Sequence, residues 1–346
     1  MSSTKAFTIE AVKDYYGRVL GGTEDLQTSA CCTAERLLPH LAAIEALVHP
    51  EVKEKFYGCG APLPPALEGA TVLDLGCGSG RDTFILSKLV GPQGKVIGVD
   101  MTPAQLSVAE KYLEYHQNTF GLARPNVRLA CGYIEDLAAV GIESGSVDVV
   151  VSNCVVNLSP DKPRVFAEVF RVLKPGGELY FSDVFAGRRV PAELQIDPVF
   201  IGECLGGALY LEDFRRLLGA IGIFDHRVVN QRRLTLDNPD LAARSAGVEF
   251  YSMTVRAFQL DLEDVGEDYG QTARYLGTLP EYPDAFVLDE QFRFATGQAV
   301  PVCGNTAAML GQTRYRSHFE LVGDRRVHRG RFGTRPVAAK EKTGCC

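Results

Sequence analysis

The segment that most constrains the fold is a short apolar strand followed at once by a glycine-rich turn. Residues Thr71–Leu75 are apolar apart from one aspartate, and the next five positions place glycine at every second residue. A helical pattern then covers residues 82–89, and a second apolar strand covers 95–99. This order predicts a β-α-β unit in which the glycines let a ligand approach the backbone closely.

The alternation of strands and helices continues along the chain. Thr102 and Pro103 predict the start of a helix that runs to about Phe120, because a threonine N-cap followed by proline is a common helix beginning. Later elements of the same pattern are strands at 127–131, 147–152 and 178–184 and a helix at 163–173. We therefore expect an α/β fold with a doubly wound, largely parallel sheet of the Rossmann-like kind.

The sequence on either side of this region differs in pattern. Apolar spacing at 9–20 and 34–48 predicts helices before the sheet, and strand-like patterns at 228–236 and 248–260 give way to less regular sequence after it. We expect four parts: an N-terminal helical segment with Cys31 and Cys59 (1–69), the sheet domain (70–240), a smaller C-terminal α+β domain (241–337), and a flexible tail with Cys345 and Cys346 (338–346).

Composition excludes several classes of function. The chain has 36 lysines and arginines against 43 aspartates and glutamates, a formal charge of −7, whereas proteins that bind nucleic acid or anionic membranes are normally basic. No apolar run reaches the ~18–20 residues that span a bilayer, and residues 1–10 lack the apolar core of a signal peptide. We therefore expect a cytoplasmic monomer without nucleic-acid or membrane partners.

The ten cysteines do not follow a common metal or redox motif. No C-x-x-C spacing occurs, which excludes zinc-ribbon and thioredoxin-like sites, and the six histidines offer no paired ligand spacing. We therefore predict no structural metal. Because thiols stay reduced in the cytosol, another role for these cysteines has to be considered.

The loop Asp74–Gly80 distinguishes between two kinds of nucleotide site. It reads DLGCGSG, with an acidic residue two positions before the first glycine, and Arg81 follows the third. A dehydrogenase loop of the G-x-G-x-x-G type binds a pyrophosphate. The pattern here instead resembles the loop of class I S-adenosylmethionine methyltransferases. The resemblance implies that the amino-acid end of S-adenosylmethionine is cradled by Asp74, Gly76, Gly78 and Gly80.

Two further segments match the same kind of site. Asp100 lies 24 residues after Gly76, at the end of the second strand, where its carboxylate can accept hydrogen bonds from both ribose hydroxyls. Ile134 and Glu135 follow the third strand, where that methyltransferase family packs against and hydrogen-bonds the adenine. The alternative for Glu135 is a cap on the following turn. The candidate cofactor contacts are completed by Tyr57, Met101 and Asn153.

Four cysteines lie in segments that carry a second resemblance. Cys154 ends the fourth strand, at the carboxyl edge of the sheet where a transferred methyl should lie, and Cys204 follows the fifth strand. Cys59 and Cys31 precede the sheet. The surrounding segments read DLQT, YGCG, SNCVVNL and GECLGGA. Over residues 12–218 the chain resembles the arsenite S-adenosylmethionine methyltransferases.

This resemblance implies roles for the four thiols. Cys59, Cys154 and Cys204 would hold trivalent arsenic, and Cys31 could take a place or pair with Cys59 when the product is reduced. Thiolates are the soft ligands that select a soft, thiophilic centre. Any one of these cysteines taken alone would instead be an inert core thiol. Residues 300–309 also resemble the final domain of the family.

The chemistry of such a site is simple. Three thiolates leave the arsenic lone pair pointing away from the sulfurs, so in-line attack on a sulfonium methyl needs no general base. Positioning is then the main catalytic contribution, at roughly 7–11 kcal/mol. We expect an enzyme of arsenic detoxification that methylates arsenite and methylarsenite, with glutathione or thioredoxin as thiol reductant. The alternatives are a carbon methyltransferase acting on a quinone or sterol, and a non-catalytic arsenic-binding thiol protein.

Overall fold

The strand predicted at residues 71–75 lies inside the main sheet, with parallel neighbours on both sides. The computed structural model describes residues 37–236, 238–245 and 247–333. Its strands are β1 (Thr71–Leu75), β2 (Lys95–Asp100), β3 (Val127–Cys131), β4 (Val147–Asn153), β5 (Leu173–Ala186), β6 (Leu209–Tyr210), β7 (His226–Arg233), β8 (Phe250–Phe258), β9 (Gln271–Tyr275), β10 (Ala285–Val287), β11 (Arg293–Ala295), β12 (Ala299–Val302) and β13 (Phe319–Val322).

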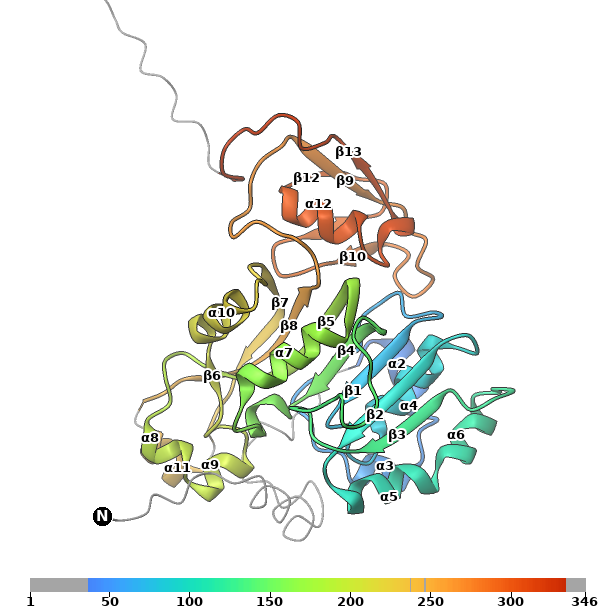
Figure 1. Cartoon of the computed structure of the whole chain (residues 1–346), viewed down its shortest axis with the longest axis vertical. Helices are drawn as coiled ribbons and strands as arrows, with labels where there is room; N and C mark the ends of the chain where they lie inside the picture. Colours follow the sequence, from blue (N-terminus) through green and yellow to red (C-terminus); the bar gives the residue numbers. More distant parts are fainter. Residues whose placement is uncertain (1–36, 237, 246, 334–346) are drawn as a thin grey trace, which may run out of the picture.

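Helices surround this sheet (Figure 1). They are α2 (Pro39–Glu45), α3 (Pro50–Glu54), α4 (Arg81–Val90), α5 (Pro103–Lys111), α6 (Leu113–Thr119), the 3-10 turn η3 (Val156–Leu158), α7 (Lys162–Val172), α8 (Ala192–Gln195), α9 (Pro198–Gly202), α10 (Leu211–Ala220), α11 (Pro239–Arg244), α12 (Gly304–Gly311) and the 3-10 turn η4 (Arg316–His318). Each described helix is too short or too polar to cross a membrane.

The order of strands explains where a ligand can bind. The main sheet runs β3-β2-β1-β4-β5-β8-β7, and β6 pairs with β5. The pairs from β3 to β5 are parallel, whereas β8 is antiparallel to both β5 and β7. The chain therefore winds outwards in two directions from β1 and β4, which confirms the expected doubly wound, largely parallel sheet. Ligands of such sheets bind at the carboxyl ends of the strands where the order reverses.

The two faces of the sheet are covered by different helices (Figure 1). Alternate residues of a strand point to opposite faces, so Val72 packs with Phe84 of α4, whereas Leu73 and Leu75 belong to the apolar cluster with Phe166 of α7. All five side chains are fully buried. The sheet is thus the middle layer of three, and both of its faces are held by apolar packing.

Three elements differ from the sequence prediction. The helix expected to run to Phe120 breaks at Tyr112 into α5 and α6. The residues 174–177, which separate the expected helix at 163–173 from the expected strand at 178–184, lie within β5. Leu173 pairs with Val147 and regular pairing resumes only at Glu178, so the glycine-containing turn is a bulge in the sheet.

The third difference concerns the end of the sheet domain. β8 pairs with β5 along nine consecutive residues, so the main sheet continues past residue 241, where a boundary was expected. The small antiparallel sheet β12-β9-β13, the hairpin β10-β11 and α12 follow it and form a separate layer at one end of the molecule (Figure 1). The helix expected at 9–20 and the tail 338–346 lie outside the described residues.

A buried ion cluster joins this layer to the main sheet. Glu178 of β5 and Arg256 of β8 are both fully buried, and the guanidinium Nε donates to Glu178 Oε1 at 2.6 Å. Arg256 also donates to the Tyr315 hydroxyl at 2.6 Å and to the Leu288 carbonyl at 2.9 Å. Because the last two groups belong to the C-terminal part, the buried charges tie the two parts together.

Replacing Arg256 with methionine should strongly destabilise the protein, because the buried Glu178 carboxylate would lose its fully buried guanidinium partner and keep only its ion pair with Arg314 at 2.5 Å. Breaking a buried ion pair in this way costs about 3–5 kcal/mol in free energy of unfolding. Urea denaturation followed by circular dichroism measures the loss. The double variant Arg256→Met/Glu178→Gln removes both fully buried charges and should recover part of it. Equal midpoints for Arg256→Met and the wild type would contradict this role of the ion pair.

Candidate active site

The glycine-rich loop after β1 forms the floor of a pocket at the carboxyl edge of the sheet. Gly76 has a φ of +67°, and a Cβ at this position would lie 2.1 Å from the Val155 side chain. Gly80 has a φ of +93° and is the N-cap of α4. Neither backbone conformation is readily available to other residues, so the sequence pattern is a direct consequence of this turn.

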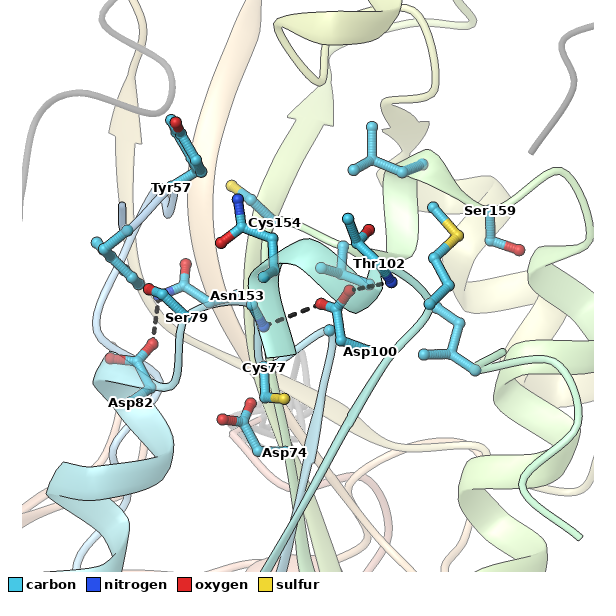
Figure 2. Close-up of a pocket in the computed structure, with 18 of the residues that line it drawn as sticks. Tyr57, Asp74, Cys77, Ser79, Asp82, Asp100, Thr102, Asn153, Cys154 and Ser159 are labelled. Atoms are coloured by element: carbon cyan, nitrogen blue, oxygen red, sulfur yellow. Dashed lines mark hydrogen bonds between the residues drawn. The ribbon is translucent and has the colours of Figure 1, made fainter. Parts of the chain in front are cut away.

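Asp100 connects this loop to the next strand. Its Oδ2 accepts the Gly78 N–H at 2.9 Å, and its Oδ1 accepts the Thr102 N–H at 2.8 Å, so the carboxylate lies between the loop and the start of α5 (Figure 2). Burial raises the pKa of Asp100, and the two N–H groups oppose that rise because they stabilise the ionised form. The carboxylate faces the pocket with unused acceptor capacity.

Asp74, at the end of β1, lies deeper in the same wall. Its Oδ2 accepts the Thr83 hydroxyl at 2.6 Å, which fixes the side chain against α4. Burial and the nearby charge of Asp82 raise the pKa of Asp74 to about 7, whereas the Thr83 hydrogen bond lowers it. A pocket wall with carboxylates at this density favours a ligand that carries positive charge.

The pocket holds about 970 Å³ of free space, including its open mouth. Nine of the ten predicted cofactor contacts line it, namely Tyr57, Asp74, Gly76, Gly78, Asp100, Met101, Ile134, Glu135 and Asn153. Gly80 does not line the pocket, because its part in the loop is to begin α4.

Several lining residues were not predicted from the sequence. Ser79 lies between two loop glycines, Asp82 follows the loop, and Gln105 lies a few residues after Asp100. Their closeness to these motifs is the sequence signal that could have identified them as pocket residues. The Ser159 hydroxyl comes from a loop after η3 and donates a short hydrogen bond to Glu135. This hydrogen bond connects two pocket loops. The alternative role of Glu135, a cap on the following turn, does not account for this contact.

The side-chain amide of Asn153 connects the pocket to the segment that carries Cys59. Its Oδ1 accepts the N–H groups of Cys59 at 3.1 Å and Gly60 at 3.2 Å. Its Nδ2 donates to the Gly60 carbonyl at 2.9 Å and to Asp82 Oδ2 at 2.8 Å. A Cβ at Gly58 would lie 2.7 Å from this amide, which explains one of the two glycines that flank the cysteine.

Three of the four predicted arsenic-binding cysteines come together beside this amide. Cys59, Cys154 and Cys204 are each at most 3% exposed and belong to one buried cluster. The Cys204 Sγ lies 3.5 Å from the Cys154 carbonyl oxygen. The fourth, Cys31, lies outside the described residues.

Cys59 and Cys154 are joined by a disulfide, with 5.9 Å between their Cα atoms. The resemblance implied that Cys31 could take a place among the ligands or pair with Cys59 when the product is reduced, and Cys31 lies outside the described residues. Within the described chain Cys59 is paired with Cys154, because the Asn153 amide holds the Cys59 backbone against the end of β4. The bond also shows that the two sulfurs are close enough to bind one ion or atom together.

The backbone at two of these cysteines is unusual. Cys154 has a φ of +58° and Cys204 a φ of +59°, in the left-handed region that few residues other than glycine adopt. Such a conformation costs roughly 1–2 kcal/mol per residue. Strained residues of this kind cluster at functional sites, where the surrounding structure holds them in place.

Asp183, near the end of β5, is a buried charge beside the thiols. Its carboxylate oxygen and the sulfurs of Cys59 and Cys154 all lie within 4.8 Å of one another. Burial raises the pKa of Asp183 to about 7, and the N–H groups of Val184 and Asn157 oppose this rise. No sequence motif includes Asp183, because a single aspartate within an apolar strand carries no recognisable spacing.

Comparison with known proteins places the whole chain in one family. Residues 67–229 match a methyltransferase domain, and residues 270–343 match an arsenite methyltransferase C-terminal domain. An arsenite methyltransferase from Aquipseudomonas alcaligenes is 49% identical, over 97% of this chain and 99% of that protein. The human arsenite methyltransferase is 43% identical, over 89% of this chain and 82% of that protein.

A solved structure agrees with the sequence relatives. An arsenic (III) S-adenosylmethionine methyltransferase from Chlamydomonas reinhardtii superposes with a TM-score of 0.83 at 47% identity, covering 86% of this chain and 99% of that one. The similarity thus includes the sheet, the pocket and the C-terminal layer. With the glycine loop, the pocket at the sheet edge and the buried thiols, these relationships confirm that the chain belongs to the arsenite methyltransferase family, whose members are S-adenosylmethionine-dependent enzymes.

Proposed function

We propose that this enzyme transfers a methyl group from S-adenosylmethionine to trivalent arsenic, in arsenite and methylarsenite, while Cys59, Cys154 and Cys204 hold the arsenic. The observation that carries the proposal is the position of Cys154. Cys154 lines the pocket (Figure 2) and is bonded to Cys59 in the thiol cluster, so the two sites share this residue. Methyl donor and acceptor can therefore meet at this residue.

The pocket residues fit S-adenosylmethionine. A Cβ at Gly76 would collide with Val155, so the absence of a side chain lets the loop pack against Val155, whereas nothing lies within 4 Å of a Cβ at Gly78. Asp100, Ile134 and Glu135 all line this pocket, where Asp100 would accept the ribose hydroxyls and the other two would contact the base. Asp74 lies where the ammonium of the methionine part can approach its carboxylate. When bound, the cofactor supplies a methyl group on a positively charged sulfur.

The cysteines hold and orient the acceptor. Three sulfur ligands leave the arsenic lone pair free, and no proton has to leave the attacking atom, so the protein needs no general base. Its contribution is alignment, which can be worth roughly 7–11 kcal/mol. The Asn153 amide and the left-handed backbone of Cys154 and Cys204 supply this alignment, because they fix the thiol-bearing segments before substrate binds.

A thiol reductant such as glutathione or thioredoxin completes the proposed cycle. The disulfide between Cys59 and Cys154 joins two of the three arsenic ligands, and thiolates bind arsenic only when that bond is reduced. Two electrons from the reductant regenerate both thiols. A small or protein dithiol is the natural donor because disulfides are opened by thiolate attack.

The thiol cluster also separates this proposal from carbon methylation. A quinone or sterol methyltransferase needs an apolar acceptor pocket and a base for carbon activation, whereas the wall beside Cys154 carries three sulfur atoms. A binding protein without catalysis would not need the cofactor loop. The arrangement therefore supports arsenic methylation, with arsenic detoxification as the proposed role in the cell.

Asp100→Asn should weaken S-adenosylmethionine binding about tenfold or more, because a hydrogen bond to a carboxylate contributes ~1.5–3 kcal/mol. Calorimetric titration gives the Kd directly. Asp148→Asn is a matched control, since it changes a half-buried carboxylate at the opposite end of β4, and it should bind like the wild type. An unchanged Kd for Asp100→Asn would remove this residue from the cofactor site.

Cys154→Ser and Cys204→Ser should each abolish methylation of arsenite and of methylarsenite, because a neutral hydroxyl is a hard ligand. Cys59→Ser should fail on arsenite but retain activity on methylarsenite, which already carries one carbon and needs two sulfurs. Chromatography with elemental mass spectrometry counts the products. Cys131→Ser changes an exposed cysteine and serves as the control. Full activity of Cys154→Ser on either substrate would refute the ligand set.

A further inference from the structure

The carboxylate of Asp183 occupies a place that the binding of arsenic by thiols does not explain. Asp183 is 1% exposed, and its oxygen lies within 4.8 Å of the sulfurs of Cys59 and Cys154. Trivalent arsenic prefers soft sulfur ligands, so a hard carboxylate oxygen adds little as a fourth ligand. A buried negative charge is costly unless it is paired or hydrogen-bonded.

The charge is firmly held in this position. The Val184 N–H donates to Asp183 Oδ1 at 2.8 Å, and the Asn157 N–H donates to Oδ2 at 3.1 Å. The Asn157 side chain in turn donates to the carbonyls of Val184 at 2.6 Å and Cys204 at 3.3 Å. The same residue therefore fixes both the carboxylate and the segment of the third thiol.

The nearby cation leaves the carboxylate facing the sulfurs. Lys162 opposes the negative charge of Asp183 electrostatically, but its ammonium donates to the backbone carbonyls of Asn157 at 3.2 Å and Ser159 at 3.0 Å. The carboxylate thus keeps an acceptor side towards the thiol cluster. A charge that forms among the three sulfurs would lie close to it.

Methyl transfer moves a positive charge to that place. The arsenic lone pair forms the new As–C bond, the C–S bond of the sulfonium breaks, and its electron pair stays on sulfur. Sulfur becomes a neutral thioether and arsenic gains one positive charge, so the charges balance without a proton or an oxidant. An anion fixed beside arsenic stabilises the product side more than the reactants, and burial increases this effect.

We propose that Asp183 accelerates methyl transfer by stabilising the positive charge that develops on arsenic. This inference rests on the proposed function and adds a residue that no cysteine or cofactor motif includes. The carboxylate needs no contact with the cofactor and no proton transfer to act in this way. Its effect should therefore appear in the rate of transfer and leave the binding of either substrate nearly unchanged.

The test compares Asp183→Asn with the wild type in single-turnover methylation, with arsenite bound beforehand and the rate expressed per bound arsenic. We expect the rate to fall about 10²-fold, as for the loss of other fixed groups that stabilise transition-state charge. The Kd for arsenite, from equilibrium dialysis with elemental analysis, and the Kd for S-adenosylmethionine, from calorimetry, should change less than about threefold. Asp183→Glu keeps the charge and should recover part of the rate.

Ser182→Ala is the matched control for disturbance of the strand. Ser182 precedes Asp183 in β5, is fully buried and shares a 2.8 Å hydrogen bond with Thr254, so its loss removes a buried contact but no charge. Its transfer rate should stay close to that of the wild type. Rates for Asp183→Asn within about twofold of the wild type, or a matching loss in Ser182→Ala, would overturn the inference.

The measurement also separates failure of this inference from failure of the proposed function. If Asp183→Asn loses arsenite affinity to the same extent as rate, the carboxylate organises the thiols and the charge-stabilising role is wrong. If the wild type methylates arsenite and Asp183→Asn does so equally well, the proposed function stands and this inference alone fails. If the wild type releases no methylated arsenic, both the proposed function and the role of Asp183 are wrong.

Discussion

The amide of Asn153 is the contact on which the geometry of the site depends. One side chain binds the backbone of Cys59 and Gly60 and the carboxylate of Asp82, which lies in the first turn of α4 after the cofactor loop. All of these hydrogen bonds are buried, so water does not compete with them. Arg81 extends the network to Glu45 of α2. Donor pocket and acceptor thiols are therefore parts of one polar network at the end of β4.

The doubly wound sheet explains why such a network can form. β1, β2, β4 and β5 are parallel, so their carboxyl ends deliver Asp74, Asp100, Cys154 and Asp183 to the same edge. The functional residues come from segments far apart in the sequence, yet the position of each is set by the end of the strand that carries or precedes it. Apolar packing on both faces then keeps the strand ends in register, so that stability and site geometry share one cause.

The sequence predicted most of this arrangement because the relevant signals are local. The bounds of β1 and β3 follow from apolar runs ended by glycine or polar residues, and the loop glycines are required by the turn itself. The pairing of β8 with β5 is a contact between segments about 70 residues apart, and no local pattern marks it. Asp183 was missed for the same reason, since its function depends on which thiols the fold brings beside it.

β5 carries two buried acids, and their different surroundings suggest different uses. Glu178 is paired with Arg256, so its charge is compensated in the resting protein and serves to join the C-terminal layer to the sheet. Asp183, five residues further on, is held by backbone N–H groups and faces sulfur atoms. Dipoles of this kind keep a carboxylate in place without neutralising it fully. The charge of Asp183 thus remains available for a cation that exists only while the reaction takes place.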